Sequence, residues 1–166
     1  MMITKTLFSN NRISLILIYF TLFVWLWTVF NISAWRRDNV VIHDIISYYS
    51  YLPAIFIYND LSFAFVDELP DDFTGKIWYL TTKDGARVQK MSMGVSVLYS
   101  PFFFIAHQHA KMANVPADGY SWPYSMWLAL SSVFYAFLAL FFLRKILLRF
   151  FNDKITTITL LIIAFG

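Results

Sequence analysis

Residues 13–32 read "ISLILIYFTLFVWLWTVFNI", twenty positions without a charged side chain. An α-helix needs about 20 predominantly apolar residues to cross the hydrocarbon core of a bilayer. Arg12 precedes the run, and Arg36 and Arg37 follow it. A cleaved signal peptide is the alternative, but this run is longer than a typical signal core and no small-residue cleavage pattern follows it. The stretch therefore predicts a transmembrane helix at 13–33.

The composition of the whole chain agrees with a membrane protein. Of its 166 residues, 59% are hydrophobic and 20% aromatic, while only 14% are charged. Soluble domains carry about 25% charged residues, and a chain of this length would leave large apolar patches in water. The sequence contains no basic stripe that would favour a nucleic-acid partner. The absence of cysteine excludes disulfides and thiolate metal sites.

A second long apolar segment starts at Pro123. Residues 123–143, "PYSMWLALSSVFYAFLALFFL", are uncharged and lead into "RKILLRFF". They predict a transmembrane helix at 123–147, followed by a short cytoplasmic loop at 148–154. A further apolar segment occupies 155–166, and twelve residues are too few to span a bilayer. We therefore expect 155–166 to be the start of another transmembrane helix and the chain to be the N-terminal part of a longer protein.

The segment between these helices is long and contains one shorter apolar stretch. Residues 91–106, "MSMGVSVLYSPFFFIA", are interrupted by serines and a proline, which favours an interfacial helix over a crossing. With two complete spans, the cytoplasmic side holds six basic residues and one acidic residue, whereas 34–122 holds seven basic and nine acidic residues. This distribution satisfies the positive-inside rule. It predicts a cytoplasmic N-terminus (1–12) and an external loop (34–122).

The expected fold class is an all-α polytopic membrane protein whose long external loop contains juxtamembrane helices. The loop is predicted to hold an aromatic helix at about 44–58, an acidic turn at 67–72 and a juxtamembrane helix at about 91–110. A short hairpin is expected within "GKIWYLTTKDGARVQK" (75–90), where "KDG" is a turn signal.

Four residues of the loop are candidates for a functional site. Asp44 opens the helical pattern and would make a good N-cap, or it serves as a catalytic carboxylate. Tyr48 and Tyr49 either belong to an interfacial aromatic belt or line a sugar or lipid site. Lys90 either extends toward lipid headgroups or neutralises a lipid phosphate.

Other polar residues carry weaker signals. His107 and His109 lie two apart, so in a helix they point to different faces and joint metal ligation is not expected. Asp118 is expected to cap a turn that enters the second span. The sequence contains no phosphate-binding glycine loop, zinc spacing or Ser/His/Asp order.

Several of these motifs together resemble a known family. They are "YYSYLPAIFIYNDLSF" (48–63), a Lys-x3-Gly (90–94) before "VLYSPFFFIAH" (97–107), and "DGYSWPYSMWLALSSVFYAFLALFFLRK" (118–145). Together they resemble the N-terminal region of bacterial polytopic glycosyltransferases of the GT-C fold, a group that includes protein mannosyltransferases and the lipid A aminoarabinose transferase. The resemblance covers nearly the whole chain, with loose motifs.

The resemblance implies an enzyme of the bacterial inner membrane that transfers a sugar from a polyprenyl-phosphate carrier to an acceptor on the external face. Asp44 matches the family's catalytic acid, which acts as a general base or within a metal-supported site, and Lys90 matches the lysine that meets the carrier phosphate. Many members have an acidic pair where this chain has His43–Asp44, so a divalent metal cofactor stays open. The alternative is a non-enzymatic polytopic membrane protein, such as a transporter, flippase or assembly subunit.

Overall fold

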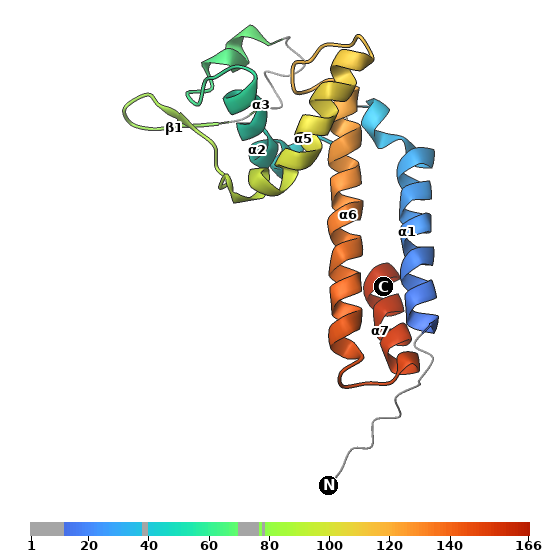
Figure 1. Cartoon of the computed structure of the whole chain (residues 1–166). Helices are drawn as coiled ribbons and strands as arrows, with labels where there is room; N and C mark the ends of the chain where they lie inside the picture. The colour runs from blue at the N-terminus through green and yellow to red at the C-terminus, as the bar shows by residue number, and fades with distance from the viewer. Residues whose placement is uncertain (1–11, 38–39, 70–76, 78) are drawn as a thin grey trace. The chain divides into compact units, whose positions relative to one another are not determined.

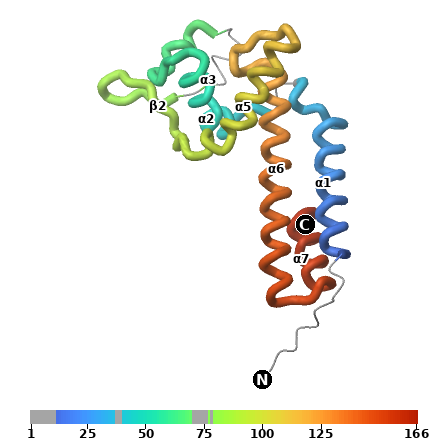
Figure 2. The backbone as a smooth tube through the Cα atoms, in the orientation of Figure 1, coloured from blue at the N-terminus to red at the C-terminus, as the bar shows by residue number. Residues whose placement is uncertain are grey.

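The computed structural model describes residues 12–37, 40–69, 77 and 79–166. The predicted N-terminal segment 1–12 lies outside these residues except for Arg12, as do positions 70–72 of the predicted acidic turn. The described part is mostly helical, which confirms the helical class. It divides into two compact units, Met1–Ile32 with Ser132–Gly166 and Ser33–Ser131. Figures 1 and 2 show the course of the chain through the elements of each unit.

The first unit is a group of apolar helices. It contains α1 (Ile13–Ile32), the later part of α6 (Trp122–Leu147) and α7 (Asp153–Phe165). Ile18, Leu140 and Leu160 are buried between them. Eight other large hydrophobic side chains of α1 are exposed. The stretch Ile13–Arg36 and α6 are both long and apolar enough to cross a membrane.

A buried carboxylate joins two helix starts in this unit. Oδ2 of Asp153 accepts a hydrogen bond from the Ile13 amide at 3.0 Å, and Oδ1 accepts from the amide and hydroxyl of Ser14. Nε of Arg144 in turn donates to the Ser14 hydroxyl at 2.7 Å. The first amides of a helix lack intrahelical partners and carry partial positive charge. Asp153 therefore satisfies the start of α1 while lying in the first turn of α7.

The second unit is built from short elements around one long helix. In chain order these are η1 (Ala34–Arg37), α2 (His43–Tyr49), α3 (Tyr51–Phe56), η2 (Ala64–Glu68), β1 (Leu80–Thr81), β2 (Arg87–Val88), α5 (Gly94–Met112) and the beginning of α6. The predicted juxtamembrane helix at 91–110 corresponds to α5, which is not among the helices apolar enough to cross a membrane. α5 packs against α2 and α3.

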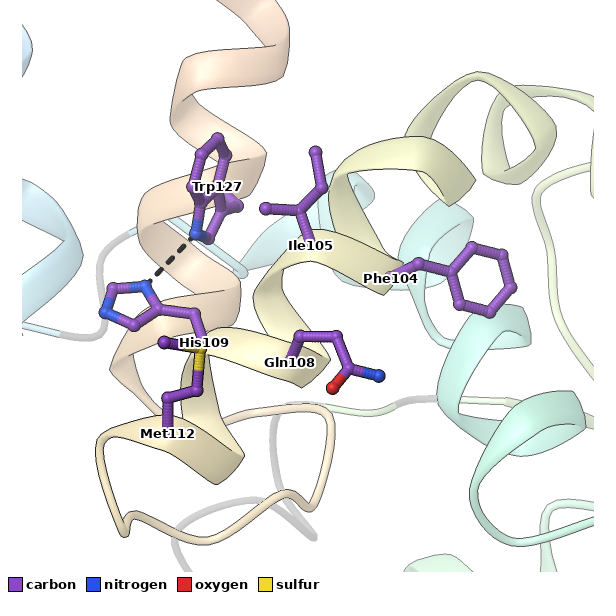
Figure 3. Close-up of a pocket in the computed structure, with 6 residues that line it drawn as sticks. All are labelled: Phe104, Ile105, Gln108, His109, Met112 and Trp127. Carbon is purple, nitrogen blue, oxygen red and sulfur yellow. Dashed lines mark hydrogen bonds between the residues drawn. The ribbon is translucent and has the colours of Figure 1, made fainter.

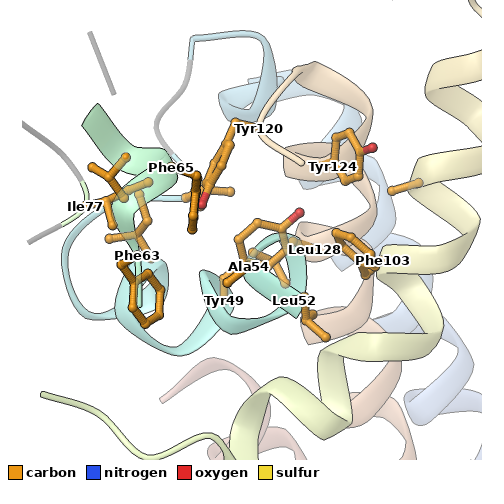
Figure 4. Packing of buried hydrophobic residues seen from close by; sticks show 14 of the residues in the cluster. Tyr49, Leu52, Ala54, Phe63, Phe65, Ile77, Phe103, Tyr120, Tyr124 and Leu128 are labelled. Carbon is orange, nitrogen blue, oxygen red and sulfur yellow. The ribbon is translucent and has the colours of Figure 1, made fainter. Parts of the chain in front are cut away.

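An aromatic core holds these elements together. Figure 4 shows Tyr49 of α2 between Phe103 of α5 and Tyr120, with Tyr124 of α6 beside Phe103. Edge-to-face aromatic contacts of this kind add to the stabilisation from buried area. Other buried members of the cluster are Val41, Ile46, Leu52, Ala54, Phe63, Phe65, Val66, Ile77, Ala106, Ala110 and Leu128.

The predicted single helix at 44–58 is wrong in detail, because the segment forms two helices, α2 and α3, with a turn at Ser50. Pro53 explains the interruption. Its nitrogen has no hydrogen to donate to the carbonyl of Tyr49 four residues earlier, and its ring crowds that carbonyl. Pro53 is tolerated because it lies in the first turn of α3.

The predicted N-cap role of Asp44 is also wrong. The N-cap residue of α2 is Ile42, which is extended (φ −137°, ψ 167°), and His43 has a positive φ of 52°. Asp44 lies in the first turn of the helix and makes no side-chain capping hydrogen bond. The carboxylate is thereby left on the exposed side of α2.

The predicted hairpin is confirmed. β1 pairs antiparallel with β2, Leu80 opposite Val88 and Thr81 opposite Arg87, and Gly85 in the turn has a φ of +80°. Arg87 fixes the hairpin to η2 through a 2.5 Å ion pair with Asp67 and a 2.9 Å hydrogen bond to the Phe63 carbonyl.

Candidate functional site

Asp44 and Tyr48 lie on one side of α2. They are four residues apart, and residues at this spacing are neighbours on a helix surface. Asp44 is exposed and Tyr48 is half-buried. The main-chain carbonyl of Tyr48 accepts a hydrogen bond from the hydroxyl of Ser96 in the first turn of α5. The start of α5 is therefore fastened to the same helix that carries Asp44.

Lys90 lies in the segment between β2 and α5. The residue after it, Met91, accepts a 2.8 Å hydrogen bond through its carbonyl from the Tyr51 hydroxyl, so this segment is fastened to α3. Lys90 itself is exposed. Within the described part of the chain, neither Lys90 nor Asp44 has a hydrogen-bond or ion-pair partner for its charged group. Both charges are thus open to a ligand.

The structure separates the two tyrosines that were predicted to contact a substrate. Tyr49 is only 1% exposed, and its hydroxyl donates a 2.5 Å hydrogen bond to the carbonyl of Gly119. Burial raises the pKa of this phenol well above its usual value. The ring and hydroxyl of Tyr49 are enclosed by protein. Of the two tyrosines, only Tyr48 has accessible surface that a substrate could contact.

The tyrosine-rich stretch 48–58 makes hydrogen bonds to later parts of the unit. Besides Tyr49 and Tyr51, Tyr58 donates a 3.0 Å hydrogen bond to the Asp118 carbonyl and stacks on Phe65 at 4.2 Å. Burial, together with nearby Asp118 and Glu68, raises the pKa of Tyr58. Three hydroxyls of this stretch therefore bind main-chain carbonyls at 91, 118 and 119.

Asp118 caps the turn that enters α6, as the sequence predicts. Its Oδ1 accepts hydrogen bonds of 2.8 Å from the amides of Tyr120 and Ser121. The intervening Gly119 has a φ of +88°, a backbone conformation that glycine adopts at little cost.

The two histidines of α5 bind different partners on α6. Nδ1 of His107 lies 2.6 Å from the Tyr124 hydroxyl, and Nδ1 of His109 accepts a 3.2 Å hydrogen bond from the Trp127 indole. Burial and the charge of Lys111 lower the pKa of His107. Both rings thus fasten α5 to α6 rather than converging on one point.

One polar side chain near the site could not be found by sequence reasoning. Gln89, next to Lys90, is buried, and neither atom of its amide has a hydrogen-bond partner among the described residues. A buried amide without partners is unfavourable by about 1–3 kcal/mol. Nothing in the hairpin pattern distinguishes this glutamine from an exposed one.

The residues around Asp44 do not form a metal site by themselves. Across the described ranges, no three His, Cys, Asp or Glu side chains are grouped so that they would hold an ion. His43 and Asp44 are adjacent in the chain and supply one imidazole and one carboxylate.

No protein-family model matches the chain, and comparisons with curated proteins and with solved structures found no match either.

Proposed function

We propose that this protein is a membrane glycosyltransferase that transfers a sugar from a polyprenyl-phosphate donor to an acceptor at the external face of the membrane. The observation that carries the proposal is that Asp44 and Lys90 supply a carboxylate and an ammonium group, each exposed and each without a partner among the described residues. The resemblance of the surrounding motifs to GT-C enzymes supplies the reaction class.

Membrane location is supported by the outward face of the first unit. Ile13–Arg36 and α6 have the length and hydropathy of membrane-crossing segments, and little of either is buried within the protein. On α1, Ile16, Phe23 and Trp27 are each more than half exposed. In water such a surface would be unfavourable, whereas in a bilayer it contacts lipid tails.

The chemistry assigns one task to each charge. As the acceptor hydroxyl attacks the anomeric carbon, its proton must leave, and the Asp44 carboxylate takes it as general base. The bond from the anomeric carbon to the carrier phosphate breaks at the same time, and negative charge grows on that phosphate. The Lys90 ammonium stabilises this charge. Tyr48, one turn from Asp44, offers an aromatic edge to the sugar.

Replacing Lys90 by Gln is expected to reduce sugar transfer about tenfold or more, because a hydrogen bond to a charged group contributes roughly 1.5–3 kcal/mol. The assay is the initial rate of transfer from a polyprenyl-phosphate sugar in membranes that contain the full-length protein. Lys83→Gln is the matched control, since Lys83 is an exposed lysine at the hairpin tip. Equal rates for the two variants would remove Lys90 from the site.

The topology is testable because the chain has no cysteine. Single cysteines at Asn114, exposed after α5, and at Phe150, 76% exposed between α6 and α7, report on the two sides of α6. A membrane-impermeant maleimide added to intact cells is expected to label Asn114→Cys and to leave Phe150→Cys unlabelled until the cells are opened. Labelling of both before opening, or of Phe150→Cys alone, would contradict the proposed orientation.

The alternative is the non-enzymatic polytopic membrane protein. Transporters place ionisable groups among their helices, and Asp153 is a buried carboxylate between helices. Its oxygens, however, accept hydrogen bonds from Ile13 and Ser14. This carboxylate is accounted for as the partner of a helix start, so the enzyme is the better supported of the two functions.

A further inference from the structure

Two hollows of the second unit take no part in the proposed transfer. The first has a volume of about 360 Å³ and is lined by Trp35, Arg36 and Trp122. The rings of Trp35 and Trp122 lie 5.5 Å apart, and the guanidinium of Arg36 lies 4.8 Å from the centre of the Trp35 ring. A cation and two indoles thus surround this hollow.

The first hollow offers hydrogen-bond donors to a ligand. The guanidinium of Arg36 is exposed and presents N–H groups in a planar fork. Trp35 is only 6% exposed, and its indole nitrogen is itself buried, so what Trp35 offers is the ring on which the Arg36 guanidinium lies. Since a guanidinium carries a permanent positive charge and offers no acceptor, the matching ligand group is an anion. A phosphate, like a carboxylate, accepts two parallel hydrogen bonds from a guanidinium, and phosphate is the anion that membrane phospholipids share.

The second hollow is an apolar groove between α5 and the first turns of α6. Figure 3 shows its wall residues, with the Trp127 indole directed at His109. The groove has a volume of about 610 Å³ and is lined by Phe104, Ile105, Gln108, His109, Met112 and Trp127. Ile105 and Met112 are 45% and 82% exposed. An open apolar wall of this kind fits a hydrocarbon chain.

His109 connects the two hollows. Its ring meets Trp122 edge-on at 5.0 Å and accepts the hydrogen bond from Trp127. Trp122 lines the first hollow, and both His109 and Trp127 line the second. Aromatic side chains therefore form a continuous wall from the first hollow, with Arg36, to the apolar groove. A molecule with an anionic head and a hydrocarbon tail fits this arrangement.

We propose that Arg36, whose guanidinium lies on the Trp35 ring, binds the phosphate of an anionic membrane phospholipid, and that one acyl chain of this lipid lies in the groove between α5 and α6. The positive charge of Arg36 favours an anionic over a zwitterionic headgroup. In a zwitterionic headgroup the ammonium group offsets the attraction between the phosphate and Arg36. The site uses neither Asp44 nor Lys90, so it is separate from the proposed transfer chemistry. It would hold the α5–α6 corner to the lipid surface.

Lipid binding by the purified full-length protein in neutral detergent tests the headgroup. The probe is phosphatidylglycerol with brominated acyl chains, which quenches nearby indoles, compared with brominated phosphatidylcholine. We expect tighter binding of phosphatidylglycerol, and about tenfold weaker binding in Arg36→Gln. The affinity of Arg36→Lys is expected to lie between those of the parent protein and Arg36→Gln, since lysine keeps the charge but lacks the planar guanidinium. Arg149→Gln, a change of the same charge at an exposed arginine outside the site, is the matched control and should bind like the parent protein.

A second pair of variants tests the groove. Ile105→Asn places an amide in the wall and is expected to weaken binding several-fold, whereas Val97→Asn changes an exposed residue of α5 outside the groove and should not.

Equal affinity of Arg36→Gln and Arg149→Gln, or equal binding of both lipids, would overturn the proposal. Competition by inorganic phosphate as effective as that by phospholipid would overturn the acyl-chain part. Displacement by polyprenyl phosphate far below the phospholipid concentration would reassign the site to the sugar carrier and also refute it.

Discussion

Asp44→Asn is expected to lower sugar transfer about 10²–10⁴-fold, the range that a positioned general base contributes. The amide keeps the shape of the side chain but cannot take up the proton of the acceptor hydroxyl. Because Asp44 is exposed and makes no side-chain hydrogen bond to the cap of α2, the folded protein and its membrane insertion should be unchanged. Initial rates with a polyprenyl-phosphate sugar, scaled to the amount of protein in the membrane, measure the effect.

The control for this variant is Asp84→Asn, which removes an equal charge from the exposed hairpin turn. Its rate should match that of the parent protein. A normal rate for Asp44→Asn would remove Asp44 from the reaction. An equal loss in both variants would mean that the charge of the unit, rather than the position of one carboxylate, governs the rate.

Gly119→Ala is expected to destabilise the second unit by roughly 2–5 kcal/mol, combining overpacking with a left-handed backbone. A Cβ at this position would lie 2.6 Å from Cβ of Pro53, and the φ of +88° disfavours any side chain. The same residue supplies the carbonyl that Tyr49 binds, so a shift that relieves the clash weakens the buried hydrogen bond. The midpoint of thermal unfolding in detergent, followed by circular dichroism, should fall by several degrees.

Two other glycines separate the causes. Gly85 has a φ of +80°, and a Cβ added there would have no neighbour within 4 Å, so Gly85→Ala isolates the backbone strain. Gly94 begins α5 with open space and no left-handed φ, so Gly94→Ala should change stability little. Gly119→Ala should unfold at the lowest temperature of the three. Coinciding midpoints for Gly119→Ala and Gly94→Ala would refute the close packing against Pro53.

The long helices were predictable because length and the absence of charge suffice to define them. The uncharged run at 13–32 corresponds residue for residue to α1, and the predicted start at Pro123 lies one residue inside α6. The hairpin was also predictable, since "KDG" places a flexible glycine where the chain must turn. In each case the signal is local in the sequence.

The helix start at Asp44 was misplaced for a physical reason. Asp44 is a favourable capping residue by type, but Ile42 has the extended backbone conformation of the cap and His43 takes the positive φ. The interruption near Ser50 had a recognisable cause in Pro53. The sequence contains no signal for the difference in burial between Tyr48 and Tyr49. Which of the two side chains is buried depends on where Phe103 and Tyr120 pack.

The remaining contacts bring together residues that are distant in the chain. Tyr49 binds Gly119 across 70 positions, and His107 meets Tyr124 only because α5 folds against the start of α6. The pairing of Trp35 with Trp122 is of the same kind. Single-sequence patterns describe periodicity within an element, and they contain no measure of which elements meet.

The contact of Asp153 with the start of α1 sets an order on biogenesis. Its hydrogen-bond partners at Ile13 and Ser14 precede it by 140 and 139 positions. At about 5–20 residues per second, a ribosome needs roughly 7–28 s to reach residue 153 after residue 13. During that interval the first amides of α1 must be solvated by water, lipid headgroups or the insertion machinery. The helix that is synthesised first is therefore completed last, when the nascent α7 delivers its carboxylate.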